Sequence, residues 1–154
     1  MTIPERFRQS ERGAELIEFA LILPLLLAML AGIVDFGRMF QRLEVTTNAA
    51  REGARLATLP GYSATDVQNR VRAYMDQGIR VGAGAQTTAT RTFVNITPGG
   101  GAQFQAAQVV VNYTDSYLIL GPIVTLIGGN AADFGTVTLS ATSTMRMETA
   151  GAQP

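Results

Sequence analysis

The carboxylate of Glu18 is the group whose position most needs a chemical explanation, because it stands in an otherwise uncharged apolar segment, residues 16–34. A carboxylate inside a membrane costs about 2.5 to 3.5 kcal/mol on insertion scales, so it usually has a charged partner or a function. Glu18 also lies near the start of the segment, where a side chain at the membrane surface reaches water. The sequence therefore leaves two interpretations: a carboxylate that has a partner or a function inside the membrane, or a solvated carboxylate at its surface.

Residue composition excludes most catalytic chemistry. The chain has 154 residues and a net charge of zero, and it contains no Cys, no His and no Trp. Thiol and imidazole catalysis, disulfides and zinc sites built from Cys or His are therefore excluded. The aspartates show no metal-ligand spacing, and the glycine run 99–101 lacks the residues that follow a phosphate-binding loop. We expect a protein that is not an enzyme, has no catalytic residue, metal ion or cofactor, and has no nucleic-acid partner, since basic residues are not in excess.

The apolar segment has the length and the composition of one membrane-spanning helix. Its nineteen residues extend over about 28 Å at about 1.5 Å per residue, close to the hydrocarbon thickness of a bilayer. Apolar residues occupy every face, whereas a core helix usually has a polar face. A secretory signal would have a shorter apolar region that ends at an Ala-x-Ala-like site, and none closes this segment. Arginines flank both ends in similar number, so charge alone does not predict the orientation.

The helical pattern continues after the span and predicts one helix over residues 14–58, which Pro60 and Gly61 end. A stripe of residues at alternating spacings of four and three keeps to one helical face. The stripe begins with bulky side chains and ends with small ones: Phe36, Phe40, Leu43, Thr47, Ala50, Ala54 and Ala57. We expect another element to approach the small end of this stripe closely.

Residues 59–154 predict a small α+β head. A helix capped by Thr65 extends to about Gln77, and strand patterns follow at residues 91–97, 108–117 and 135–148. The last pattern alternates apolar residues with Ser and Thr, as expected for an antiparallel strand with one wet face. The apolar faces of the strands require cover, which the two helices can provide. The predicted fold class is α+β, with a long N-terminal helix, a second helix and an antiparallel sheet of about three strands.

Residues 117–127 form a second apolar segment, which is interrupted by Gly121 and Pro122 and is too short to cross a membrane. We expect this segment to be part of the core or a loop that covers a groove. An interfacial dip into the membrane and contact with another subunit are the alternatives.

Arg51 and Arg55 stand four residues apart on one helical face and repel each other there. This spacing favours an external acceptor, such as a carboxylate of a partner subunit. A solvated face is the alternative, because surface ion pairs contribute little.

Four blocks of the sequence resemble the TadE-like family of pseudopilins, which belong to tight-adherence pilus systems. The blocks are residues 12–20 (RGAELIEFA), 35–38 (DFGR), 47–55 (TNAAREGAR) and 140–148 (SATSTMRME), and Pro24 interrupts the leucine-rich span between the first two. In type IV prepilins of this class, a prepilin peptidase cuts after a Gly and leaves a Glu as the fifth residue of the mature chain. The resemblance therefore implies a processing site in the first block.

Transferred to this sequence, the cleavage site lies between Gly13 and Ala14, and Glu18 and Phe19 are the matching Glu-aromatic pair. Cleavage would remove a polar leader without removing the membrane anchor, and it would create a new amine at Ala14. In pilin-like assemblies the fifth-position glutamate is thought to pair with such an amine on a neighbouring subunit. The two charges are less costly together in lipid than apart.

The resemblance also implies the organisation and the location of the chain. Residues 1–13 would be a cytoplasmic leader, residues 14–58 the transmembrane and stalk helix, and residues 59–154 a periplasmic head. We expect a single-pass inner-membrane protein with a cytoplasmic N-terminus, and after assembly the extracellular pilus is a second location. The expected partners are a prepilin peptidase and other pilins or pseudopilins, in a hetero-oligomer.

Major pilins of this class are very short after processing, so a chain with a folded head indicates a minor pilin or pseudopilin. Such a subunit would help to initiate or assemble the pilus through packing of its N-terminal helix. The alternative is an uncleaved single-span inner-membrane protein whose periplasmic head binds a ligand or a partner. The bond between Gly13 and Ala14 distinguishes the two hypotheses, because only the first requires its cleavage.

Overall fold

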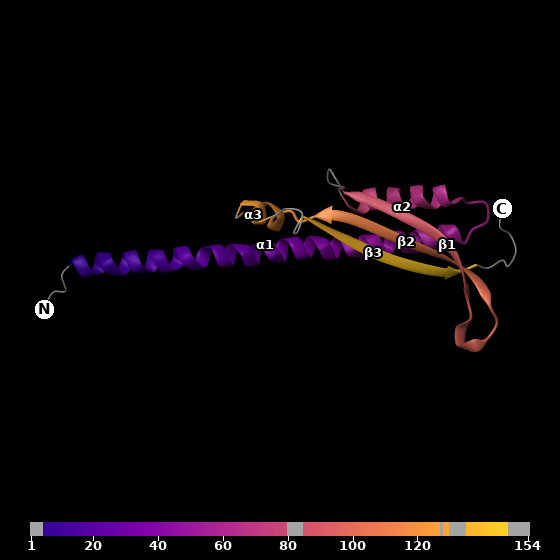
Figure 1. The fold of residues 1–154 in the computed structure, drawn as a ribbon, viewed down its shortest axis with the longest axis horizontal. Helices are drawn as coiled ribbons and strands as arrows, with labels where there is room; N and C mark the ends of the chain where they lie inside the picture. Colours follow the sequence, from indigo (N-terminus) through magenta and orange to yellow (C-terminus); the bar gives the residue numbers. More distant parts are fainter. Residues whose placement is uncertain (1–4, 80–84, 127, 130–134, 148–154) are drawn as a thin grey trace.

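The computed structural model describes residues 5–79, 85–126, 128–129 and 135–147 (Figure 1). Its long helix and its three strands run along one common axis, and the shorter helices lie beside them. In chain order the elements are α1 (Glu5–Ala57), α2 (Ala64–Gly78), β1 (Gln86–Ile96), the 3₁₀ turn η1 (Pro98–Gly100), β2 (Phe104–Ser116), α3 (Leu120–Leu126) and β3 (Thr136–Arg146). The predicted α+β class, with a long apolar helix, a second helix and a three-stranded antiparallel sheet, is confirmed.

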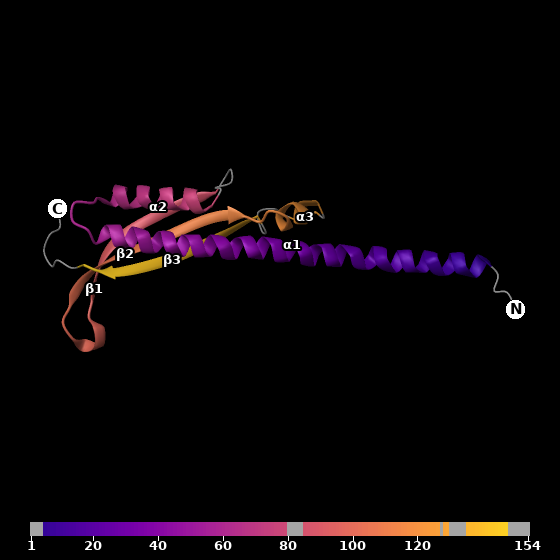
Figure 2. The same cartoon turned by 180° about the vertical axis from the view of Figure 1, so that it is seen from behind.

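The N-terminal half of α1 extends away from the rest of the protein, as both ribbon views show (Figures 1 and 2). The helix begins at Glu5 and continues without a break through Pro24. Within its most apolar window only 6% of the residues are buried. A core helix of a soluble protein would be mostly buried, so this part of α1 has the length, the composition and the exposure of a membrane span.

The second helix starts earlier than the sequence predicted. Ser63, and not Thr65, is its N-cap: the Ser63 hydroxyl accepts from the backbone N–H of Asp66 at 3.2 Å, and the Ser63 N–H donates to the Asp66 carboxylate at 2.8 Å. This reciprocal pair is a capping box, and it satisfies two backbone donors that the helix leaves unpaired. The Ser63 hydroxyl also donates to the Asp66 carboxylate at 2.7 Å, and this hydrogen bond, together with the one from the Ser63 N–H, lowers the pKa of the Asp66 carboxyl. The spacing of Ser63 and Asp66 contained this information, because a Ser followed three residues later by an acidic residue is a start signal.

The sheet is a simple antiparallel meander in the order β1-β2-β3, with β2 in the centre. Val111 of β2 stands opposite Ala89 of β1 and Ala141 of β3, and all three are buried. The connection between β1 and β2 turns through Gly99 and Gly100, whose φ angles of +58° and +77° favour glycine. The glycine run therefore forms a turn, as its sequence indicated.

One face of the sheet packs against α1 and α2, and the other is polar. The core between the layers contains Val109, Val111 and Tyr113 of β2 and the buried α2 residues Val67, Val71 and Met75. On the opposite face, hydroxyl and amide groups pair across the strands, as in the Thr114–Thr138 contact of 3.0 Å. The alternation predicted for the last strand is confirmed, because the Thr residues of β3 are exposed and the intervening residues are buried or partly buried.

The apolar stripe predicted on α1 is buried against the head only at its small end. Ala50, Ala54 and Ala57 are buried against the head, whereas Phe36 and Phe40 are 56% and 70% exposed. Between residues 31 and 46 the buried face lies about one residue before the predicted stripe. It comprises Ala31, Asp35, Met39, Arg42 and Thr46. The apolar periodicity favoured the bulky residues for the packed face. The head instead packs on this part of α1 through polar side chains whose hydrogen-bond partners come from remote parts of the chain.

Candidate functional site

The predicted processing residues all lie on the exposed N-terminal half of α1. Gly13, Ala14, Glu18 and Phe19 are each exposed to solvent in the isolated chain. Ala14 and Glu18 are four residues apart and therefore share one helical face. A side chain added at Gly13 would meet no atom within 4 Å, so packing does not require a glycine there. The predicted role of Gly13 and Ala14 as a cleavage site, and of Glu18 and Phe19 as its motif, stays a prediction.

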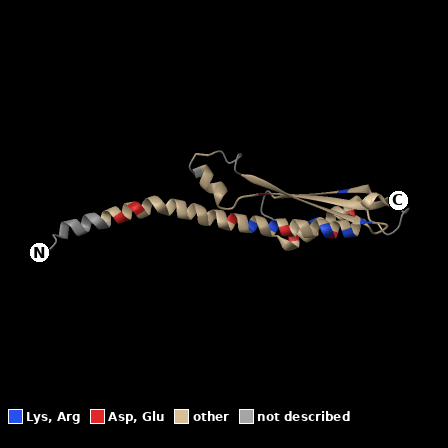
Figure 3. Cartoon of the chain, turned by 90° about the horizontal axis from the view of Figure 1, so that it is seen from below, with Lys and Arg blue, Asp and Glu red and all other residues tan. Residues whose placement is uncertain are grey.

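Figure 3 shows how the charges divide α1. Two acidic residues mark the start of the part whose side chains the structure describes, a stretch without charge follows, and the charged residues resume where the head begins. The four ion pairs formed among the described side chains all lie within residues 35–115. Glu18 is not part of any of them. The apolar stretch thus separates the predicted processing site from the head.

The charged residues at the far end of α1 connect it to α2. Arg55 donates to both carboxylate oxygens of Glu52, at 3.0 and 2.9 Å, and Arg70 of α2 donates to the same carboxylate at 2.8 Å. These hydrogen bonds lower the pKa of Glu52 to about 2. Arg51 makes one long contact, 3.4 Å to Asn48. Arg55 thus already has an acceptor within the chain, and the proposed contact of Arg51 and Arg55 with a partner subunit stays a prediction.

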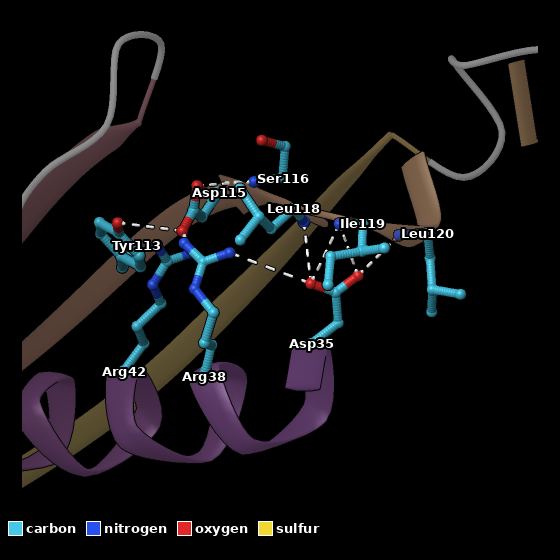
Figure 4. Close-up of polar contacts among 9 residues, drawn as sticks. All are labelled: Asp35, Arg38, Arg42, Tyr113, Asp115, Ser116, Leu118, Ile119 and Leu120. Carbon is cyan, nitrogen blue, oxygen red and sulfur yellow. Dashed lines mark hydrogen bonds and ion pairs between the residues drawn. The ribbon is translucent and has the colours of Figure 1, made fainter. Parts of the chain in front are cut away.

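Asp35, which the sequence patterns did not single out as a site, lies at the centre of the junction between α1 and the head (Figure 4). The Asp35 side chain is 1% exposed. Its carboxylate accepts from the backbone N–H groups of Leu118, Ile119 and Leu120, at 3.0, 3.0 and 2.8 Å. Those N–H groups belong to the start of α3, so Asp35 caps a helix that is more than eighty residues away in the sequence. Negative charge at a helix N-terminus is stabilising.

A second polar contact stands two helical turns further along α1. The guanidinium of Arg42 forms a buried ion pair with Asp115 at the end of β2, and the Tyr113 hydroxyl donates to the same carboxylate at 3.2 Å (Figure 4). Both charged side chains are less than 9% exposed. Burial lowers the pKa of Arg42, and the nearby Tyr113 opposes this effect. Removal of one partner from a buried ion pair strongly destabilises the fold, because the other charge stays buried without a partner.

Both contacts had a signal in the sequence. Asp115 continues the alternation of Val109, Val111 and Tyr113, so a period of two residues places it on the buried face of β2. Asp35 and Arg42 are seven residues apart on α1, which places them on one helical face. Charges at positions that the pattern assigns to the core are expected to be paired.

An apolar groove of about 250 Å³ lies beside this junction. It is lined by Phe36, Met39, Phe40, Leu43, Tyr117, Val137 and Leu139. Among the described residues, no three acidic side chains are close enough together to hold a metal ion. The expectation that the protein is not an enzyme and needs no cofactor stays a prediction.

The architecture and the site together are consistent with a membrane-anchored, pilin-like protein: one apolar helix that could span a membrane continues into an α+β head. Residues 13–55 match the family model described as TadE-like protein. This match confirms the resemblance over the processing motif, the apolar run and the stalk, and it suggests involvement in tight-adherence pilus systems. It ends before α2, so the resemblance of residues 140–148 stays a prediction. No curated protein and no solved structure matches the chain.

Proposed function

We propose that the protein is a minor pilin or pseudopilin of a tight-adherence pilus system, which a prepilin peptidase cuts between Gly13 and Ala14. It helps to initiate or assemble the pilus through packing of its N-terminal helix. The observation that carries this proposal is the apolar half of α1, which contains the processing motif, matches the TadE-like family and is almost unpacked within its own chain.

The exposed apolar surface of α1 is the proposed assembly surface. Leu16, Leu21 and Ile33 are among the many large apolar side chains that project from it, and each is more than half exposed. In the membrane these side chains contact lipid, and in an assembly they contact the helices of other subunits. Helix association in lipid depends on close packing and on polar groups that find partners across the interface. Glu18 supplies such a polar group.

Glu18 is proposed to pair with the amine that cleavage creates at Ala14 of a neighbouring subunit. The carboxylate lies on an exposed face of α1, so a second helix that packs alongside can reach it. A carboxylate and an ammonium that approach in lipid compensate much of each other's desolvation. The pairing makes assembly depend on prior cleavage, because an uncut chain has a peptide bond where the amine would be.

Cleavage requires a local opening of α1, since Gly13 and Ala14 lie inside the helix. Glycine lowers the cost of that opening, because it stabilises a helix less than Ala by about 1 kcal/mol. Its lack of a side chain also leaves the scissile bond unobstructed. We place the N-terminus in the cytoplasm and the head in the periplasm, because the peptidase of this class acts on the cytoplasmic side.

The intact mass of the purified protein, expressed with and without its cognate prepilin peptidase, tests this proposal. Wild-type protein should lose residues 1–13 only when an active peptidase is present. Gly13→Leu and Glu18→Ala should abolish the loss. Glu15→Ala is the matched control, because it removes another exposed carboxylate three residues from Glu18 and should still be cut.

Wild-type protein that stays uncut beside an active peptidase would refute the processing step. It would favour an uncleaved single-span protein whose head binds a ligand or partner. Cleavage of all three variants as efficiently as the wild type would show that the peptidase does not read the motif.

A further inference from the structure

The short helix α3 lies outside the sheet, beside α1, on the side of the head that faces the apolar run (Figures 1 and 2). It contacts α1 directly, and Asp35 holds its first turn. Asp35 directly follows the apolar segment 16–34. Ala31, one helical turn before Asp35 on the same face, is buried although it belongs to that segment. The last turn of the apolar segment and α3 therefore lie side by side.

The chain around α3 carries no charge. Residues 117–126, here called the foot, contain no Asp, Glu, Lys or Arg, and six of the ten are Leu, Ile or Val. Leu118 is 54% exposed, and Tyr117 lines the same apolar groove as the exposed α1 residue Phe36. Together they form an apolar surface beside the apolar segment.

Three N–H groups at the start of α3 find their acceptor within the protein. Three consecutive N–H groups, of Leu118, Ile119 and Leu120, donate to the Asp35 carboxylate. Water can satisfy the N-terminus of a helix at a wet surface, so a buried carboxylate is not required there. In a membrane the same N–H groups must find a partner inside the protein. Asp35 provides that partner at the depth where the apolar segment ends.

We infer that the foot is a second membrane contact, inserted into the interfacial region of the leaflet from which α1 emerges. The inference rests on α1 spanning the membrane, as the proposed function requires. Lipid is the occupant because the uncharged foot lies beside the last turn of the apolar segment, so the membrane that surrounds the span reaches it. The foot and α1 would together fix the tilt of the head relative to the membrane.

Cysteine labelling of the full-length protein tests the inference, since the chain contains no Cys and each substitution introduces a single thiol. Spin labels are attached at Leu118→Cys and Thr125→Cys in the foot. Thr142→Cys, on the polar face of the sheet, is the wet control, and Leu26→Cys, in the apolar segment, is the buried-in-lipid control. The proteins are reconstituted into liposomes of phosphatidylethanolamine and phosphatidylglycerol. Accessibility to oxygen, which concentrates in lipid, is compared with accessibility to a water-soluble nickel chelate.

The foot labels should show a ratio of oxygen to nickel accessibility several-fold higher than Thr142→Cys and lower than Leu26→Cys, as expected at the interface. A ratio equal to that of Thr142→Cys, with Leu26→Cys still in lipid, would overturn the inference and leave the membrane span intact. Low accessibility of the foot labels to both reagents would also overturn it, because it would show that protein, such as a second copy, covers the foot. High accessibility of the Leu26→Cys label to the nickel chelate would refute the membrane span itself, and with it both the inference and the proposed function.

Asp35→Ala, combined with Leu118→Cys, examines the role of the carboxylate. Loss of the three hydrogen bonds should shift the Leu118 label several-fold toward nickel accessibility, while Asp35→Ala should leave a Leu26→Cys label unchanged. An unchanged Leu118 label in the Asp35→Ala background would contradict the assignment of Asp35 as the group that allows the foot to insert.

Discussion

The substitution Gly53→Ala tests the close approach of α1, α2 and β2, on which the head depends. A Cβ atom built at Gly53 would lie 2.7 Å from a methyl group of Val71 and 3.2 Å from one of Val109. Atoms at the first distance must move apart, and both neighbours are fully buried. Overpacking of a dense core costs about 1 to 3 kcal/mol. The higher helix propensity of alanine offsets about 1 kcal/mol of this loss in the free energy of unfolding.

Gly37→Ala is the matched control, because Gly37 lies on the same helix and a Cβ there would meet nothing within 4 Å. Gly37→Ala should leave the stability of the head unchanged or raise it, whereas Gly53→Ala should lower it. The difference between the two variants isolates overpacking. For a domain of 60 to 100 residues, 1 kcal/mol corresponds to about 4 to 8 °C in Tm. Gly53→Ala should therefore melt at least about 4 °C below Gly37→Ala.

The assay is thermal unfolding of the full-length protein in detergent, followed by near-UV circular dichroism of its four tyrosines, of which Tyr113 is fully buried. Val71→Ala removes the methyl group that stands closest to the added Cβ. The double variant Gly53→Ala/Val71→Ala should be more stable than the sum of the single effects by about 0.5 to 3 kcal/mol. Equal melting temperatures of Gly53→Ala and Gly37→Ala, without coupling to Val71→Ala, would refute the packing argument.

Two further predictions concern charged groups. Glu52 has its pKa lowered from 4.5 to about 2 by Arg55 and Arg70, so the stability that it contributes is complete above about pH 4.5 and is lost as the pH falls toward 2. The shift sets an upper limit of about 3 kcal/mol, which solvent screening of the half-exposed arginines reduces to about 1 kcal/mol. Glu52→Gln should therefore be less stable than the wild type near neutral pH, and the difference should disappear only as the pH falls through about 2; a constant Tm difference would contradict this. Asp115→Ala should cost about 3 to 5 kcal/mol in urea unfolding by leaving Arg42 buried without its carboxylate, whereas replacing both by apolar residues should recover most of the loss. An equal loss in the single and the double variant would show that the ion pair is not the cause.

The block at residues 35–38, one of the four that carried the family resemblance, has a structural explanation in this protein. Asp35 caps α3, and Arg38 lies 3.9 Å from the Asp35 carboxylate. Both residues stand where α1 leaves the apolar segment and meets the head. Through Asp35, the block therefore helps to hold the head against the helix.

Local patterns determined much of the fold. The apolar run, the stop at Pro60 and Gly61, and the alternation in β2 and β3 each depend on neighbouring residues, so the sequence alone predicted the long helix and the buried faces of the strands. The processing motif is local as well, because Gly13 and Glu18 are read along one short segment. The family match over residues 13–55 confirms the resemblance that this segment suggested.

Only the tertiary structure decided which face of α1 the head covers, because that choice depends on residues far apart in the chain. Apolar periodicity favoured Phe36 and Phe40, whereas the structure buries Asp35 and Arg42 and leaves both phenylalanines exposed. The N–H groups that satisfy Asp35 come from residues 118–120, and the carboxylate that satisfies Arg42 comes from Asp115. Burial of a charge is favourable only when its partner is in place, and the position of a remote partner is set by the whole fold.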